Sequence, residues 1–176
     1  MGTRSVLVCA VSALMACGSK AGWLDGKVAG NEVHVKEAVF IPLPNGELYV
    51  AAADQENLCA IVNRQQKPVD EMNALEILLA NWDGARPQEL VTGSYTATQT
   101  ASGPGLLAYP LLYWIRDCIV NTQLFPSKGT ITLEQIGAAE AGAQTVLSVD
   151  LAFGSEHMDG HLNATYCALS EGRNGC

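Results

Sequence analysis

The chain has 176 residues, and its 18 acidic side chains outnumber its 10 basic ones, which gives a formal net charge of −8. This acidity disfavours nucleic-acid binding and repels anionic lipid head groups. The length suits a single domain with a hydrophobic core of its own. No segment after residue 17 has the uninterrupted apolar length needed to cross a bilayer as a helix.

The first residues have the layout of an export signal. One cation, Arg4, precedes an apolar run from Val6 to Met15 that is too short to span a membrane. The following Leu14-Met15-Ala16-Cys17 resembles a bacterial lipobox, in which the cysteine is lipidated and becomes the mature N-terminus. We therefore predict a signal peptide over residues 1–16 and a lipid such as palmitate on Cys17. The alternative is a buried first helix with an incidental cysteine.

The residue after the lipobox bears on location. Gly18 in the second mature position, in place of aspartate, resembles the pattern that is sorted to the outer membrane. We therefore expect a protein of the cell envelope, held at the outer membrane by its lipid and not by a basic patch. Glycines recur at every fourth position from Gly18 to Gly30, so residues 17–30 are predicted to form a flexible tether. Residues 31–176 are expected to form one domain.

The cysteine count agrees with export. Removal of the signal deletes Cys9 and lipidation occupies Cys17, which leaves an even set and predicts two disulfides in an oxidising compartment. No pair has the Cys-x-x-Cys spacing of a zinc or redox site. Cys167 is expected to point away from the main core and to pair with a covering segment or the tail, without a unique partner. The four disulfide candidates are Cys59, Cys118, Cys167 and Cys176.

The early part of the domain has the pattern of a hairpin followed by a short helix. Asn45-Gly46 is a strong turn signal between two strand-like runs. Asp54 is predicted to begin a short helix or turn that carries Cys59 and ends before Pro68. Residues 70–82 fit either a helix or a strand, because their apolar side chains match both periods.

Strand patterns dominate the second half. The most apolar stretch, LLAYPLLYWIRDC, is broken by Pro110, so it is expected to be an edge strand, two short strands or an exposed loop. Alternating residues then predict a C-terminal hairpin with GSEHMDG as its turn.

Six motifs in this order resemble a group of small exported lipoproteins known from predatory and gliding bacteria. They are VKEAVF, LYVAAADQENLCAIV, LEILLANWDG, GSYTAT, GTITLEQI and HLNATYC. The resemblance implies an all-β fold and favours a strand over Ala74–Ala80, but it brings no activity. Because those lipoproteins often look like sandwiches, we expect a disulfide-stapled antiparallel β-sandwich with a short helix or turn around Cys59.

Catalytic and cofactor motifs are absent from the sequence, which lacks a nucleophile elbow, a dinucleotide fingerprint, a phosphate loop and His-Glu-x-x-His. We therefore predict no enzyme, no cofactor and no metal. The acidic pairs Asp54 with Glu56 and Asp70 with Glu71 are interpreted as cap and turn residues. One further cluster could ligate a metal, but it is interpreted as a solvated turn: Glu156, His157, Asp159 and His161.

Two function classes follow. The first is a lipid-anchored envelope protein with a structural or binding role, and the second is a small envelope hydrolase that uses carboxylates in a cleft. Tyr109, Tyr113 and Trp114 form a possible interaction surface for another envelope protein or a glycan. The alternative is that the segment around Cys59 covers this run.

Overall fold

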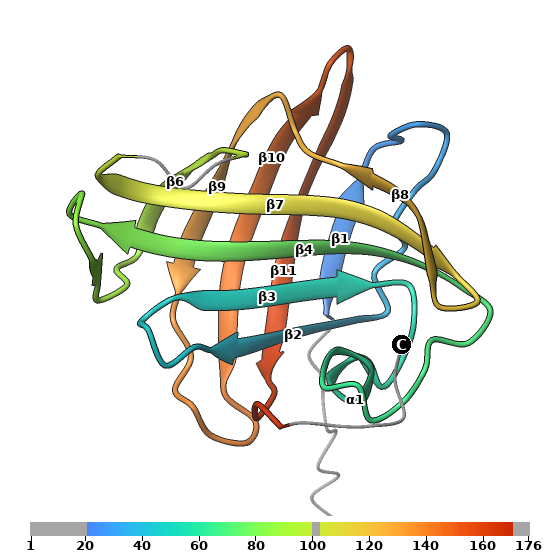
Figure 1. The fold of residues 1–176 in the computed structure, drawn as a ribbon, viewed down its shortest axis with the longest axis horizontal. Coiled ribbons are helices and arrows are strands. Elements are labelled where there is room, and N and C mark those ends of the chain that lie inside the picture. The colour runs from blue at the N-terminus through green and yellow to red at the C-terminus, as the bar shows by residue number, and fades with distance from the viewer. Residues whose placement is uncertain (1–20, 100–102, 171–176) are drawn as a thin grey trace, which may run out of the picture.

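The computed structural model describes residues 21–99 and 103–170, and almost all of its regular structure is strand. Figure 1 shows strands wrapped around a central axis and one short helix at the lower end. The elements are β1 Gly22–Asp25, β2 Glu37–Pro42, β3 Leu48–Ala53, α1 Leu58–Val62, β4 Glu71–Trp82, β5 Pro87–Gln88, β6 Gly93–Ala97, β7 Gly105–Arg116, β8 Ile119–Leu124, β9 Lys128–Gln135, β10 Gln144–Phe153 and β11 Glu156–Tyr166.

The strands form a closed barrel, and the expected antiparallel β-sandwich is therefore wrong. The pairing runs β4-β3-β2-β11-β10-β9-β6-β7, and β7 pairs with β4 to complete the circle. Two neighbouring pairs, β2 with β11 and β6 with β7, are parallel, so the barrel is mixed. The sequence missed this because alternation shows that a strand has a buried face but not whether its sheet closes.

Closure depends on β7, the run that Pro110 was expected to break. β7 pairs with β4 over its whole length, while its other edge pairs first with β6 and then with β8. Ala108 accepts a hydrogen bond from Thr98 on the β6 side, and Pro110, two residues on, faces the same side. This is the gap between β6 and β8, so the N–H that proline lacks is not needed for a ladder bond.

The barrel interior is the main core. On β4 the inward residues Leu75, Ile77 and Leu79 are fully buried, and they meet inward residues of the opposite wall such as Leu147 and Ile131. Each side chain of this size contributes about 1.5–3 kcal/mol through burial. Residues 70–82, which fitted helix or strand, therefore include a strand, because the inward positions follow a period of two.

The tether prediction is also corrected for the residues that the structure describes. β1 pairs with β11, and Val28 is fully buried, so residues 21–30 belong to the barrel. Gly22 and Gly26 lie so close to β11 that an added Cβ would fall 2.0 Å and 2.2 Å from its carbonyl oxygens. Part of the glycine repeat is thus a close-approach pattern. Cys17 lies outside the described residues.

The hairpin predictions are confirmed with one change. β2 and β3 are joined at Asn45-Gly46, and Gly46 has the positive φ that such turns require. β10 and β11 also pair as a hairpin, but β11 begins at Glu156. The segment EHMDGH therefore lies in a strand and not in the turn.

Candidate functional site

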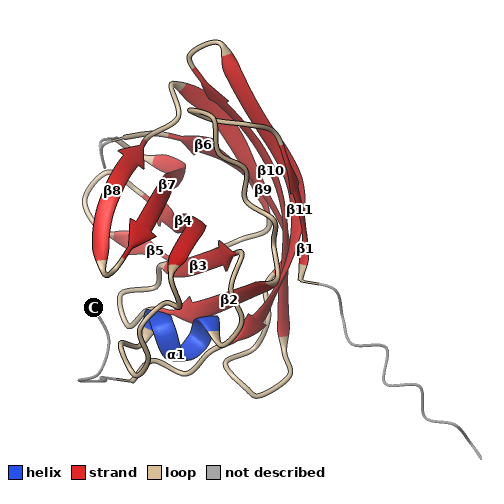
Figure 2. Ribbon diagram, turned by 90° about the vertical axis from the view of Figure 1, so that its right-hand side faces the viewer, coloured by secondary structure: helices blue, strands red, loops and turns tan. Residues whose placement is uncertain are grey.

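The outer face of β2, β3, β4 and β7 carries a second apolar cluster outside the barrel. Met72, Ala74 and Tyr113 belong to it, and Leu58 of α1 packs on the same face. Figure 2 shows α1 lying against the outside of this wall near β2 and β3. Because these strands are apolar on both faces, they require a cover, and α1 provides part of it.

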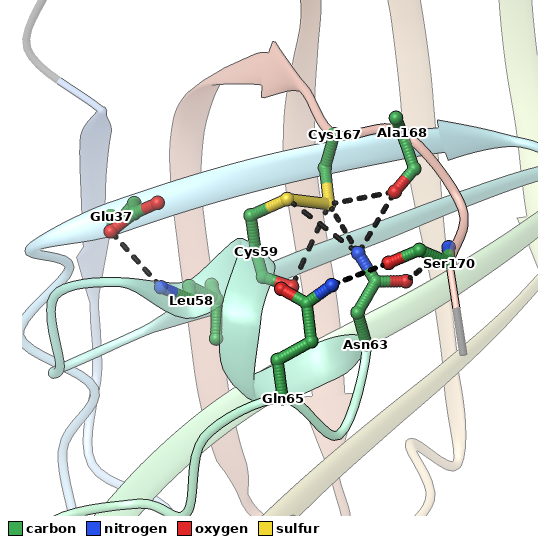
Figure 3. Close-up of a disulfide and its surroundings, with 8 residues drawn as sticks. All are labelled: Glu37, Leu58, Cys59, Asn63, Gln65, Cys167, Ala168 and Ser170. Atoms are coloured by element: carbon green, nitrogen blue, oxygen red, sulfur yellow. Dashed lines mark hydrogen bonds between the residues drawn. A yellow bond between two sulfur atoms is a disulfide. The ribbon is translucent and has the colours of Figure 1, made fainter. Parts of the chain in front are cut away.

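A disulfide fixes α1 to the end of β11. Cys59 and Cys167 are bonded with their Cα atoms 5.6 Å apart, as Figure 3 shows. Cys167 lies on the outer face while Leu162 and Ala164 face the interior, which confirms the predicted direction of its sulfur. The pairing is one of the alternatives that the sequence left open.

Asn63, which follows α1, provides a second fastening that sequence analysis missed. Its Nδ2 donates to the carbonyl oxygen of Ala168 at 2.9 Å, and its Oδ1 accepts from the N–H of Ser170 at 2.8 Å (Figure 3). The residue is buried, so both ends of its amide are used where water is excluded. The only sequence signal was its place just beyond a cysteine-bearing helix.

Between α1, the outer sheet face and the β7–β8 hairpin lies a cavity of about 380 Å³, which we name the α1 pocket. The hairpin wall turns through Asp117 and Cys118, which both have positive φ, as a two-residue turn of this kind requires. The pocket is lined by Tyr49, Ile61, Val62, Arg64, Pro68, Met72, Glu76, Leu111, Tyr113, Ile115, Cys118, Val120 and Gln123.

A carboxylate flanked by two tyrosines lies in this lining. Glu76 points outward from the middle of β4, and its Oε1 accepts hydrogen bonds from the hydroxyls of both Tyr49 and Tyr113, the latter at 2.9 Å. The tyrosines come from β3 and β7, which flank β4 in the sheet. Three adjacent strands therefore bring these three side chains together.

The two tyrosines remain protonated donors over the physiological range. Burial raises the pKa of Tyr49 and of Tyr113 well above the usual value for a phenol, and the neighbouring Glu76 carboxylate raises both further. A neutral hydroxyl is the form that can donate to Oε1. Both hydroxyls therefore serve as donors to one oxygen of the glutamate.

The second oxygen of this carboxylate remains available. Oε2 accepts no hydrogen bond from any residue in the described part of the chain, and it is not sealed from solvent. The rest of the lining combines polar groups with apolar side chains, among them Met72, Leu111 and Ile115 on the sheet side. The arrangement can bind one hydrogen-bond donor on an otherwise apolar molecule.

The predicted interaction residues separate in the structure. Tyr113 lines the α1 pocket, whereas Trp114 points into the barrel and is only 8 % exposed. Tyr109 lies on the outer face, half buried, away from the pocket lining. The three residues therefore do not form one surface, because successive residues of a strand face opposite sides.

The structure describes one of the two remaining cysteine candidates. Cys118 lines the α1 pocket and is disulfide-bonded. Cys176 lies outside the described residues.

A second, open hollow of about 1050 Å³ is lined by four acidic residues that were not expected to lie together. Asp54, Glu56, Asp70 and Glu71 all line it, because the loop after β3 lies beside the start of β4. Two of them have structural partners: Asp54 accepts two hydrogen bonds from Asn73, and Glu71 pairs with Arg116. The cap and turn interpretation is wrong for both residues, because α1 begins after Asn57 and not at Asp54, and Glu71 lies in β4.

The histidine and acid cluster of β11 lies on an exposed sheet face. His157 contacts Asp150 at 2.8 Å and Asp159 at 3.6 Å, while His161 lies 3.7 Å from Glu134. Within residues 21–99 and 103–170, no three histidine, cysteine or acidic side chains gather as metal ligands. Glu156 accepts a hydrogen bond from the backbone of Ala29.

The chain matches no protein-family model, no curated protein and no solved structure. Among the described helices, none is long and apolar enough to span a membrane.

Proposed function

We propose that the protein is a lipid-anchored cell-envelope protein that binds a small, largely apolar ligand in the α1 pocket. The observation that carries the proposal is the composition of this cavity. Its volume of about 380 Å³ is within the range of small-molecule sites, which are mostly apolar with a few convergent polar groups. Glu76 with its two tyrosines is such a group.

The anchor rests on separate support. The lipobox-like segment ends at Cys17, and the Cys59–Cys167 disulfide is of the kind that persists in oxidising compartments outside the cytoplasm. An exported domain with an acyl anchor would be held at the outer membrane, where the membrane itself is the partner of its N-terminus.

The anchor is tested by Cys17→Ala in the full-length chain. We expect this variant to lose palmitate labelling and to leave the membrane fraction, because stable attachment needs the acyl chains. Cys9→Ala is the matched control, since a cysteine inside the signal peptide should not affect either measurement. A Cys17→Ala variant that stays labelled and membrane-bound would overturn the anchor.

The binding role is tested by filling the pocket. Ile61→Trp on the α1 wall should reduce at least tenfold the binding of three probes with the same chain: n-hexylammonium, 1-hexanol and hexanoate. Ile136→Trp is the matched control, because Ile136 is partly exposed outside the pocket lining. Binding is measured by equilibrium dialysis of the full-length protein in lipid nanodiscs, with empty nanodiscs as the blank. If none of the three probes binds the wild type, the binding role is wrong.

A further inference from the structure

The α1 pocket has few charged side chains, and these differ in how deeply they are buried. Among the described residues that line it, Glu76 and Arg64 are the only acidic and basic side chains. Glu76 is half buried in the sheet face, whereas Arg64 is exposed just after α1 and has no ion pair within the described residues. The negative charge therefore lies at the floor and the positive charge at the rim.

The floor is incomplete as a hydrogen-bonding site. Both tyrosine hydroxyls donate to the same oxygen, Oε1, so Oε2 keeps its acceptor capacity toward the pocket. A half-buried carboxylate gains most from a donor that also carries positive charge, because such hydrogen bonds are about twice as strong as neutral ones.

We propose, building on the binding role above, that the ligand is a monocationic amine with an apolar body, whose ammonium group binds Oε2 of Glu76. The apolar body lies against Leu111, Ile115 and the Ile61 side of α1. A second positive charge at the outer end would meet Arg64 at the rim, so a diamine binds less well. An anionic head would be repelled by Glu76 at the floor.

The test compares head groups on one chain length. The full-length protein in nanodiscs is dialysed against n-hexylammonium, 1-hexanol, hexanoate and 1,6-hexanediammonium. We expect n-hexylammonium to bind at least tenfold more tightly than the other three. Glu76→Gln should remove this preference and bring hexylammonium and hexanol within about twofold of each other, since the amide keeps an acceptor for the tyrosines but loses the charge. Glu134→Gln, the same change on the exposed face of β9, should leave the preference intact.

The outcomes separate the two proposals. If 1-hexanol or hexanoate binds as tightly as hexylammonium, and Glu76→Gln changes nothing, the amine is wrong while the pocket remains a binding site. If no probe binds, both proposals fail. Thermal unfolding of Glu76→Gln checks the fold. If that variant is unfolded, the wild-type comparison decides, and a 1-hexanol affinity within threefold of that for n-hexylammonium would overturn the amine.

Discussion

Two outer faces of one barrel differ sharply, although the strands beneath them share the same interior. On β10 the outward residues Ser148 and Asp150 alternate with inward Leu147 and Val149, and the face is bare and polar. β4 is apolar on both sides over most of its length, and its outer face lines the α1 pocket, with α1 and its disulfide on the neighbouring β2 and β3. A strand without a polar face thus indicates that another element packs on the outside, and such covered faces are where cavities form.

We call the outer face of β2, β3, β4 and β7 the covered face and that of β10 the bare face. Removing the disulfide of the covered face should have the largest effect on stability. The Cys59–Cys167 disulfide closes a loop with a sequence separation of 108 residues, so replacing both cysteines by alanine should lower the free energy of unfolding by about 4–5 kcal/mol. Urea unfolding measures the loss. Hydrogen exchange should rise first in α1 while β10 amides stay protected, because α1 depends on the staple and β10 does not. A loss below about 1 kcal/mol would show that α1 is held without it.

A smaller loss is expected from the second fastening of the same face. Asn63→Ala removes both hydrogen bonds of a buried amide, those with Ala168 and Ser170, which should cost about 2 kcal/mol. Ser148→Ala is the matched change on the bare face and should cost less than about 0.5 kcal/mol, because its bond to Glu134 is exposed. Equal losses in urea unfolding would contradict the difference between the two faces.

The smallest effect concerns alkaline pH. Because burial and Glu76 raise the pKa of Tyr49 and Tyr113 in the folded state, the unfolded chain releases their protons first as pH rises. Their stabilising contribution is complete below the ordinary phenol pKa of about 10 and declines above it, by about 1 kcal/mol per residue between pH 10 and pH 11. Tyr113→Phe should therefore lose less stability over this interval than the wild type in urea unfolding. An equal decline in both would contradict the burial of this hydroxyl.

Local features of the covered face could be predicted from the sequence, whereas its long-range contacts could not. The β2–β3 hairpin was predictable from Asn45-Gly46, and the direction of Cys167 followed from alternation near its own strand. Glu76, by contrast, meets hydroxyls that are 27 and 37 residues away, and only the register of three strands brings them together. The available signal was one charged residue within an apolar run, which says that the charge needs a partner but not which one.

Closure of the barrel was beyond sequence reasoning for a similar reason. Pro110 predicted an interruption, and a proline in a strand does require a position where its missing N–H is not needed. Whether such a position exists depends on where β6 ends and β8 begins along β7, which is a property of neighbours and not of the run itself. Local pattern thus predicted strands correctly but not their lateral order.

The pairing of β1 with β11 limits how far Cys17 can lie from the barrel. From Cys17 to Gly22 the chain has five Cα steps, which span at most about 18 Å when fully extended. If Cys17 carries acyl chains, this short linker keeps the domain within about one molecular radius of the bilayer surface. Its ligands would then be sampled from the thin layer of solvent beside the membrane, and the barrel would search that layer by two-dimensional diffusion with its lipid.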